Sequence, residues 1–120
     1  MNININGMDY EVRFGVGFTR AIDEKYPLGN GADSHFGLGL ENTIPYLLTF
    51  SITVLAEFLY LGTVHLKKRP TQSMIDAYID KCEDIDGLFA EVMDELKKSN
   101  ATRLKVNRLV TLFEKEKESE

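Results

Sequence analysis

Residues 44–66, IPYLLTFSITVLAEFLYLGTVHL, carry a single formal charge, at Glu57. Wound as a helix at about 100° per residue, this segment places apolar side chains on two of its sides. One stripe contains Ile52, Leu55, Ala56, Leu59 and Leu66, and the other contains Phe50, Val54, Phe58 and Leu61. A helix that is apolar on two sides has to be covered on two sides. The sequence therefore predicts a central helix at about residues 51–66, with the other segments packed around it.

A β-hairpin is predicted at the N-terminal side of this segment. Apolar residues alternate with polar ones at Ile3 and Ile5, and again at Met8, Tyr10, Val12 and Phe14. Asn6-Gly7 lies between the two runs and favours a two-residue turn, because both turn positions need a positive φ. We expect strands at residues 2–5 and 8–13. Two strands alone are marginally stable in water, so the hairpin should pack its apolar face on helices or pair its edge with another chain.

Further helices are indicated by apolar residues spaced three and four apart. They fall at about residues 18–26, 36–48, 71–82, 85–98 and 102–113, and turn-forming residues at 27–35 separate the first two. Pro45 either kinks the second of these helices or opens a new one. Thr71 is an expected N-cap, as is Asp84 or Asp86. The predicted fold class is α+β, mostly α, with five or six helices in one domain at residues 1–113 and a charged, flexible tail at 114–120.

Composition and charge exclude several classes of protein. The net charge of −5 disfavours a nucleic-acid partner, which needs a basic face. The single cysteine, Cys82, cannot form an internal disulfide, and no signal peptide is expected after Met1. The central segment is long enough to span a bilayer, but Glu57 and Pro45 argue against it. A membrane-associated helical protein is therefore kept only as an alternative.

No group of residues in the sequence has the spacing of a catalytic, cofactor or metal site. His35 and His65 are far apart and have no second ligand nearby, so no metal is expected. Cys82 lies on an apolar stripe and is expected in the core. Glu57 is expected to be satisfied by Tyr60 or by a cation elsewhere. A small ligand-binding or enzymatic domain that uses Glu57 is the alternative.

The last helix carries a candidate partner or self-association surface. Its apolar residues are Val106, Leu109, Val110 and Phe113, spaced as one helical face. In a short chain this face either packs on the core or docks on a partner, in a groove or on a second copy.

Four segments together resemble a known family. They are MNININGMDYEVRFGVGFTRAIDEKY (1–26), FGLGLENTIPYLL (36–48), AEFLYLGTVHLKKRPTQSMIDAYID (56–80) and EDIDGLFAEVMDELKKSNATRLKV (83–106). In this order they resemble the tail assembly chaperones of long-tailed, non-contractile bacteriophages and of prophages in Gram-positive hosts.

The resemblance implies a mostly helical, non-enzymatic protein without a cofactor. Such a protein binds the tape measure protein, keeps it soluble and helps recruit tail tube protein around it. The resemblance also implies self-association into spiral or helical oligomers, and action in the host cytoplasm without incorporation into the mature virion. Neither nucleic acid nor membrane is an expected partner. No contact residue is carried over, so the predicted partner surface depends on the apolar face of the last helix alone.

Overall fold

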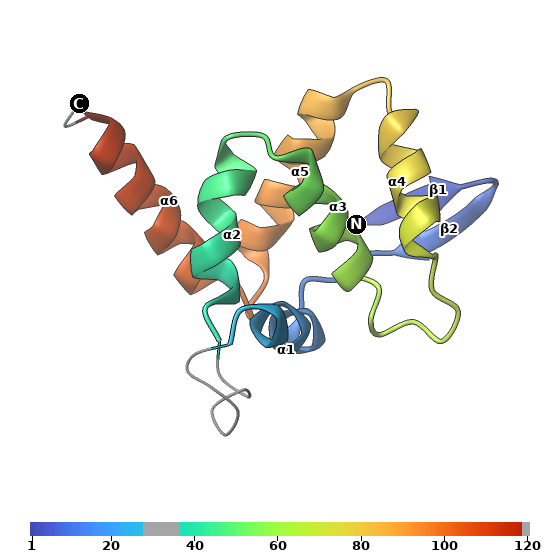
Figure 1. Ribbon diagram of the computed structural model, residues 1–120, viewed down its shortest axis with the longest axis horizontal. Coiled ribbons are helices and arrows are strands. Elements are labelled where there is room, and N and C mark those ends of the chain that lie inside the picture. Colours follow the sequence, from blue (N-terminus) through green and yellow to red (C-terminus); the bar gives the residue numbers. More distant parts are fainter. Residues whose placement is uncertain (28–36, 119–120) are drawn as a thin grey trace.

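The computed structural model describes residues 1–27 and 37–118. Within these ranges a two-stranded antiparallel hairpin is followed by six helices (Figure 1). The predicted fold class, α+β and mostly α, is confirmed. Most of the loop predicted at 27–35 lies outside the described residues, as does the predicted helix start at Phe36.

The hairpin consists of β1 (Asn2–Ile5) and β2 (Met8–Glu11), with Ile5 opposite Met8. Asn6 and Gly7 form the predicted turn, with φ values of 55° and 85°. Strand β2 ends at Glu11, opposite Asn2, rather than at residue 13, and the Arg13 N–H donates to the carbonyl of Gly62. The inward side chains of β1 are buried, as the period-two pattern predicts.

The first three helices are α1 (Val16–Lys25), α2 (Gly39–Leu48) and α3 (Ile52–Leu61). Helix α2 continues past Pro45, so the proline lies inside one helix and opens no new one. The carboxylate of Asp23 accepts a hydrogen bond from the Gly39 N–H at 2.9 Å and so fixes the start of α2 against α1. This contact joins residues 16 positions apart, across the residues that are not described.

Helix α3 lies in the middle of the molecule, between α2 and α4 (Figure 1). Leu55, Phe58 and Leu59 have 0% of their surface exposed, which fits a central helix. The helix is shorter than predicted, because it ends at Leu61 and residues 62–65 form turns. Carbonyl groups at its C-terminal end accept hydrogen bonds from other segments. The Arg69 guanidinium, for example, donates to the Tyr60 carbonyl over 3.0 Å.

The remaining helices are α4 (Gln72–Asp80), α5 (Ile85–Lys98) and α6 (Arg103–Glu118). The predicted N-caps Thr71 and Asp84 are confirmed, since their side chains accept hydrogen bonds from the N–H groups of Met74 and Gly87. Helix α6 continues through residues 114–118, beyond the predicted domain end at 113. The flexibility of the charged tail stays a prediction.

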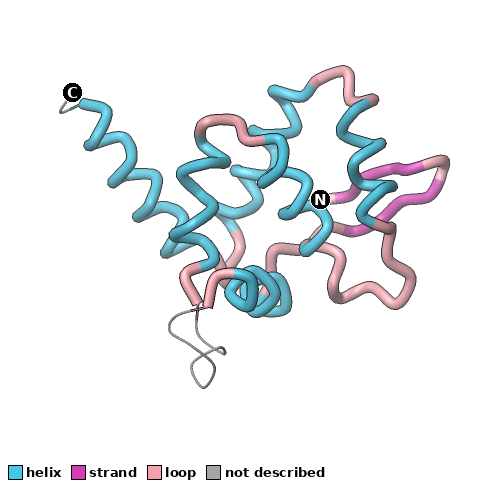
Figure 2. Tube along the Cα trace, in the orientation of Figure 1, coloured by secondary structure: helices cyan, strands magenta, loops and turns pink. Residues whose placement is uncertain are grey.

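The core consists of side chains from the hairpin and the helices, whose arrangement Figure 2 shows. Phe14, Phe18 and Phe58 meet at its centre, with ring centroids 5.0 to 6.3 Å apart. Aromatic contacts of this kind stabilise a core beyond their area burial alone. No helix in the described part of the chain has the length and apolar content needed to cross a membrane.

Candidate interaction surfaces

The predicted partner face of α6 is divided between the core and the surface. Val106 is 0% exposed and Val110 is 9% exposed, so both pack on the core of their own chain. Leu109 is half-buried, and so is Phe113, whose ring lies under the Lys117 ammonium at 5.3 Å. A role of these four residues in partner binding stays a prediction.

The opposite side of α6 is exposed and contains leucines that the apolar stripe did not include. Leu104 is 80% exposed and Leu112 is 45% exposed. We define the outer face of α6 as Leu104, Arg108, Thr111, Leu112 and Lys115, all exposed. The C-terminal half of α6 projects beyond α2, away from the rest of the molecule (Figure 1). Two isolated leucines among polar residues gave no signal in the sequence.

A second exposed apolar region is the corner between α2 and α3. We define the α2–α3 corner as residues 46–52, in which Tyr46, Phe50 and Ile52 are 61%, 66% and 47% exposed. The Phe50 ring meets the Phe89 ring of α5 edge-on, with centroids 5.4 Å apart. The sequence had assigned Phe50 and Ile52 to buried stripes, so the structure corrects both assignments.

The backbone of this corner explains why Phe50 is exposed. The Ser51 N–H donates to the Tyr46 carbonyl and the Phe50 N–H donates to the Leu47 carbonyl. These two bonds form a Schellman motif, whose C′ position needs a left-handed conformation and usually holds glycine. Phe50 occupies that position with φ of 66°, and Ser51 then caps α3 by accepting from the Val54 N–H. A phenylalanine in this conformation costs about 1–2 kcal/mol relative to one with negative φ.

A groove of about 520 Å³ lies between α3 and α4. We call it the α3–α4 groove. Its apolar lining comes from Ile52, Ala56 and Ile79, and its charged lining comes from Lys25, Glu57, Asp76 and Asp80. Three carboxylates against one ammonium make this groove acidic. Asp76 and Asp80 are exposed and lie one helical turn apart on α4.

Of the two partners expected for Glu57, Tyr60 or a cation elsewhere, the structure shows the cation, Lys25. The Lys25 ammonium lies 3.4 Å from one carboxylate oxygen of Glu57. The other oxygen is buried and has no hydrogen-bond partner within the described residues. Burial raises the pKa of the Tyr26 hydroxyl, and the negative charge of Glu57 raises it further. Tyr60 instead stacks under the Arg69 guanidinium, 4.2 Å from its ring centroid.

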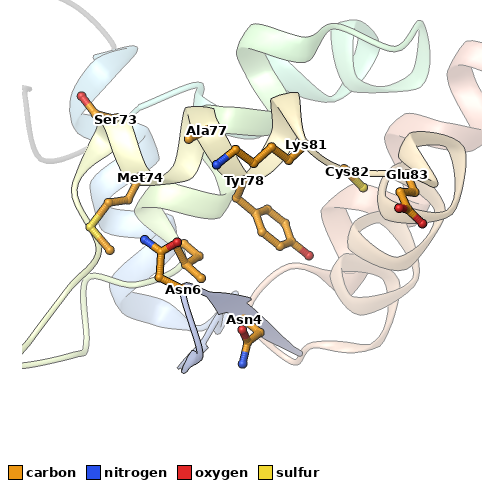
Figure 3. A pocket seen from close by; sticks show the side chains of 10 residues that line it. Asn4, Asn6, Ser73, Met74, Ala77, Tyr78, Lys81, Cys82 and Glu83 are labelled. Carbon is orange, nitrogen blue, oxygen red and sulfur yellow. The ribbon is translucent and has the colours of Figure 1, made fainter.

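A second hollow, of about 570 Å³, separates the hairpin from α4 (Figure 3). The Tyr78 side chain points from α4 into this space, and Asn4 and Asn6 border it from the hairpin. Cys82 lines the same hollow and is only half-buried, where the sequence predicted a core position. Burial raises the pKa of the Tyr78 hydroxyl, and the nearby Cys82 and Glu91 raise this pKa further.

The residues considered as metal ligands do not come together. His65 lies 3.0 Å from a Glu11 oxygen, and His35 is outside the described residues. In residues 1–27 and 37–118, no group of three or more histidine, cysteine or acidic side chains is arranged to hold a metal ion.

Comparison with known proteins gives one match. A family model described as "Phage tail assembly chaperone protein, TAC" matches residues 2–110 of the 120 in the chain. The matched range runs from the hairpin to the middle of α6, so it includes the α2–α3 corner and the α3–α4 groove. No curated protein and no solved structure matches the chain.

Proposed function

The chain belongs to the phage tail assembly chaperone family, and from this premise we propose that it binds the tape measure protein and keeps it soluble until tail tube protein is recruited. Membership of this family points to a non-enzymatic protein whose partners are phage tail proteins. The proposed place of action is the host cytoplasm, before the virion is complete.

The observation that best supports client binding is the phenylalanine at the α2–α3 corner. Phe50 is held at a backbone angle that glycine would adopt at lower cost, and most of its ring faces solvent. Residues that keep an unfavourable backbone conformation concentrate at functional sites. Exposed aromatic side chains are also the residues that most often dominate the energy of a protein interface. Phe50 and Tyr46 are therefore the side chains that we propose to contact the client.

Net charge supports the second part of the proposal, the solubility of the bound client. The chain carries a net charge of −5. A client whose apolar segments contact the corner acquires this negative charge with every bound chaperone. Like-charged complexes repel one another, which opposes aggregation.

Co-expression with a tape measure protein tests the proposal. We expect the soluble fraction of the tape measure protein to rise and the two proteins to copurify. The double variant Tyr46→Asn/Phe50→Asn should lower the copurified amount at least tenfold. Val16→Asn is the matched control, because Val16 is 57% exposed and lies on α1, outside the corner. If the wild-type pair neither copurifies nor changes in solubility, the proposed client is wrong.

We also propose that the chain self-associates into open helical arrays. Two apolar surfaces on different elements support this, namely the outer face of α6 and the α2–α3 corner. A contact between two different surfaces that does not close into a ring produces a helical array. Sedimentation velocity at rising protein concentration should show species larger than the monomer.

A further inference from the structure

The outer face of α6 has a composition suited to a protein contact. Leu104 and Leu112 offer apolar area, and Arg108 and Lys115 add two positive charges on the same face. Leu104 is 80% exposed and Leu112 is 45% exposed, while Val106 and Val110 on the other side of α6 are buried in the core. The face extends for roughly 17 Å from Leu104 to Lys115, at about 1.5 Å per residue.

The α3–α4 groove has the complementary composition. Ile52, half exposed, and the buried Ile79 give it an apolar lining, and Asp76 and Asp80 border it with negative charge. The one ammonium in its lining, that of Lys25, is paired with Glu57. An amphipathic helix whose apolar residues alternate with cations fits such a groove in both polarity and charge.

We propose that the outer face of α6 in one copy docks into the α3–α4 groove of a second copy. In this arrangement Leu104 and Leu112 meet the apolar lining, and Arg108 and Lys115 face Asp76 and Asp80. The inference rests on the proposed self-association and places the partner of α6 in the α3–α4 groove, which shares Ile52 with the α2–α3 corner.

The positions of the two surfaces determine the kind of assembly. Helix α6 projects on one side of α2, and the groove lies between α3 and α4 on the other side (Figure 1). One copy therefore cannot place its own α6 in its own groove. Each contact leaves one α6 and one groove free for further copies, so copies add head to tail, and the array stays open unless the rotation between copies closes a ring.

The size of the contact sets its strength. A single helix face buries less area than a standard protein interface, so each contact should be weak and depend on protein concentration. The four charged side chains are exposed in the free chain, where salt screens them effectively. Raising the salt from 0.05 to 0.5 M, roughly a threefold change in Debye length, should therefore weaken association several-fold.

Charge reversal tests the pairing of the two surfaces. The α6 variant is Arg108→Glu/Lys115→Glu, and the groove variant is Asp76→Lys/Asp80→Lys. Sedimentation velocity of the purified chain should show association at least tenfold weaker for either variant alone. An equimolar mixture of the two variants should associate again, because each reversed surface then meets its reversed complement.

The control is Lys67→Glu/Lys68→Glu, which changes the net charge as much as the α6 variant does at exposed positions outside both surfaces. It should sediment like the wild type. All substituted positions are exposed, and circular dichroism verifies that each variant is folded. If one double variant is unfolded, the single changes Arg108→Glu and Asp80→Lys provide the same complementary test.

Three outcomes would overturn the proposal. The first is a wild-type chain that remains monomeric, and the second is an α6 variant that sediments like the wild type. The third is a mixture of the two variants that does not regain association, which would assign α6 a different occupant, such as the tape measure protein. Because sedimentation uses the purified chain alone, a negative result here leaves copurification with the tape measure protein as a separate test of the proposed function.

Discussion

The two ends of α3 contain the same kind of side chain in opposite environments. At the C-terminal end Phe58 and Leu59 are 0% exposed. At the N-terminal end Ile52 is 47% exposed, and Phe50 just before it is 66% exposed. Apolar residues become core only where another element of the chain reaches them. Those that no element covers are available to another polypeptide, and the variants below test whether the two ends differ in this way.

The largest effect is expected at the buried end. Phe58→Ala removes the ring that contacts both Phe14 and Phe18 and should lower the free energy of unfolding by about 3–5 kcal/mol. Ile52→Ala, at the exposed end of the same helix, should lower it by less than about 1 kcal/mol. Urea unfolding followed by circular dichroism measures both. Equal losses at the two positions would show that the ends are packed alike and would remove the basis of the comparison.

A smaller effect is expected where the buried end meets the hairpin. A Cβ added at Gly62 would collide with the Cγ1 atom of Val12 and approach the Phe58 carbonyl to 3.1 Å. Gly62→Ala should therefore lower the free energy of unfolding by about 1–3 kcal/mol, the usual range for overpacking. Gly17→Ala is the matched control in α1, where the added Cβ would lie 3.5 Å from Val64, an ordinary contact. The control should be neutral or stabilising by up to about 1 kcal/mol.

The hydrogen bonds that end α3 give the third prediction. The Arg69 guanidinium donates to the Tyr60 carbonyl and to the Thr63 hydroxyl, and it also stacks on the Tyr60 ring. Arg69→Lys keeps the charge but loses the planar group, so it should lower the free energy of unfolding by about 1 kcal/mol. Lys68→Ala, at an exposed neighbour, should change it by less than about 0.5 kcal/mol. Identical unfolding midpoints for wild type and Arg69→Lys would contradict this role for Arg69.

Local sequence signals predicted the parts of the fold that local interactions determine. The Asn6-Gly7 turn and the N-caps Thr71 and Asp84 each depend on residues within a few positions, and all are present. The end of α3 was predicted too late because it depends on Arg13 and Arg69, which approach from other segments. Periodicity alone contains no information about these distant groups.

The candidate surfaces were less predictable for the same reason. The apolar stripe of α6 was recognised, but whether it is core or surface depends on α2 and α5, which cover Val106 and Val110. Leu104 and Leu112 gave no periodic signal. The exposure of Phe50 follows from a Schellman motif. Such a motif is usually recognised in a sequence by a glycine at its C′ position, but here that position holds Phe50.

The smallest effect on stability, and the most informative, is expected at the exposed end. Asparagine tolerates a left-handed conformation better than phenylalanine does, so Phe50→Asn relieves part of the backbone cost at φ of 66°. It also loses the edge-on contact with Phe89, but the ring is 66% exposed and this loss is small. The two terms nearly cancel, and the free energy of unfolding should change by less than about 1 kcal/mol in either direction.

The same substitution should separate stability from binding. If Phe50 is kept for contact with a client, Phe50→Asn should lower copurification with the tape measure protein severalfold while the unfolding midpoint stays nearly constant. Phe58→Ala would show the reverse dependence, because any loss of binding there should follow the fraction of unfolded chain. A Phe50→Asn protein that is destabilised by more than about 2 kcal/mol would mean that the ring stabilises the fold through Phe89. The exposed end of α3 would then be structural in the same sense as the buried end.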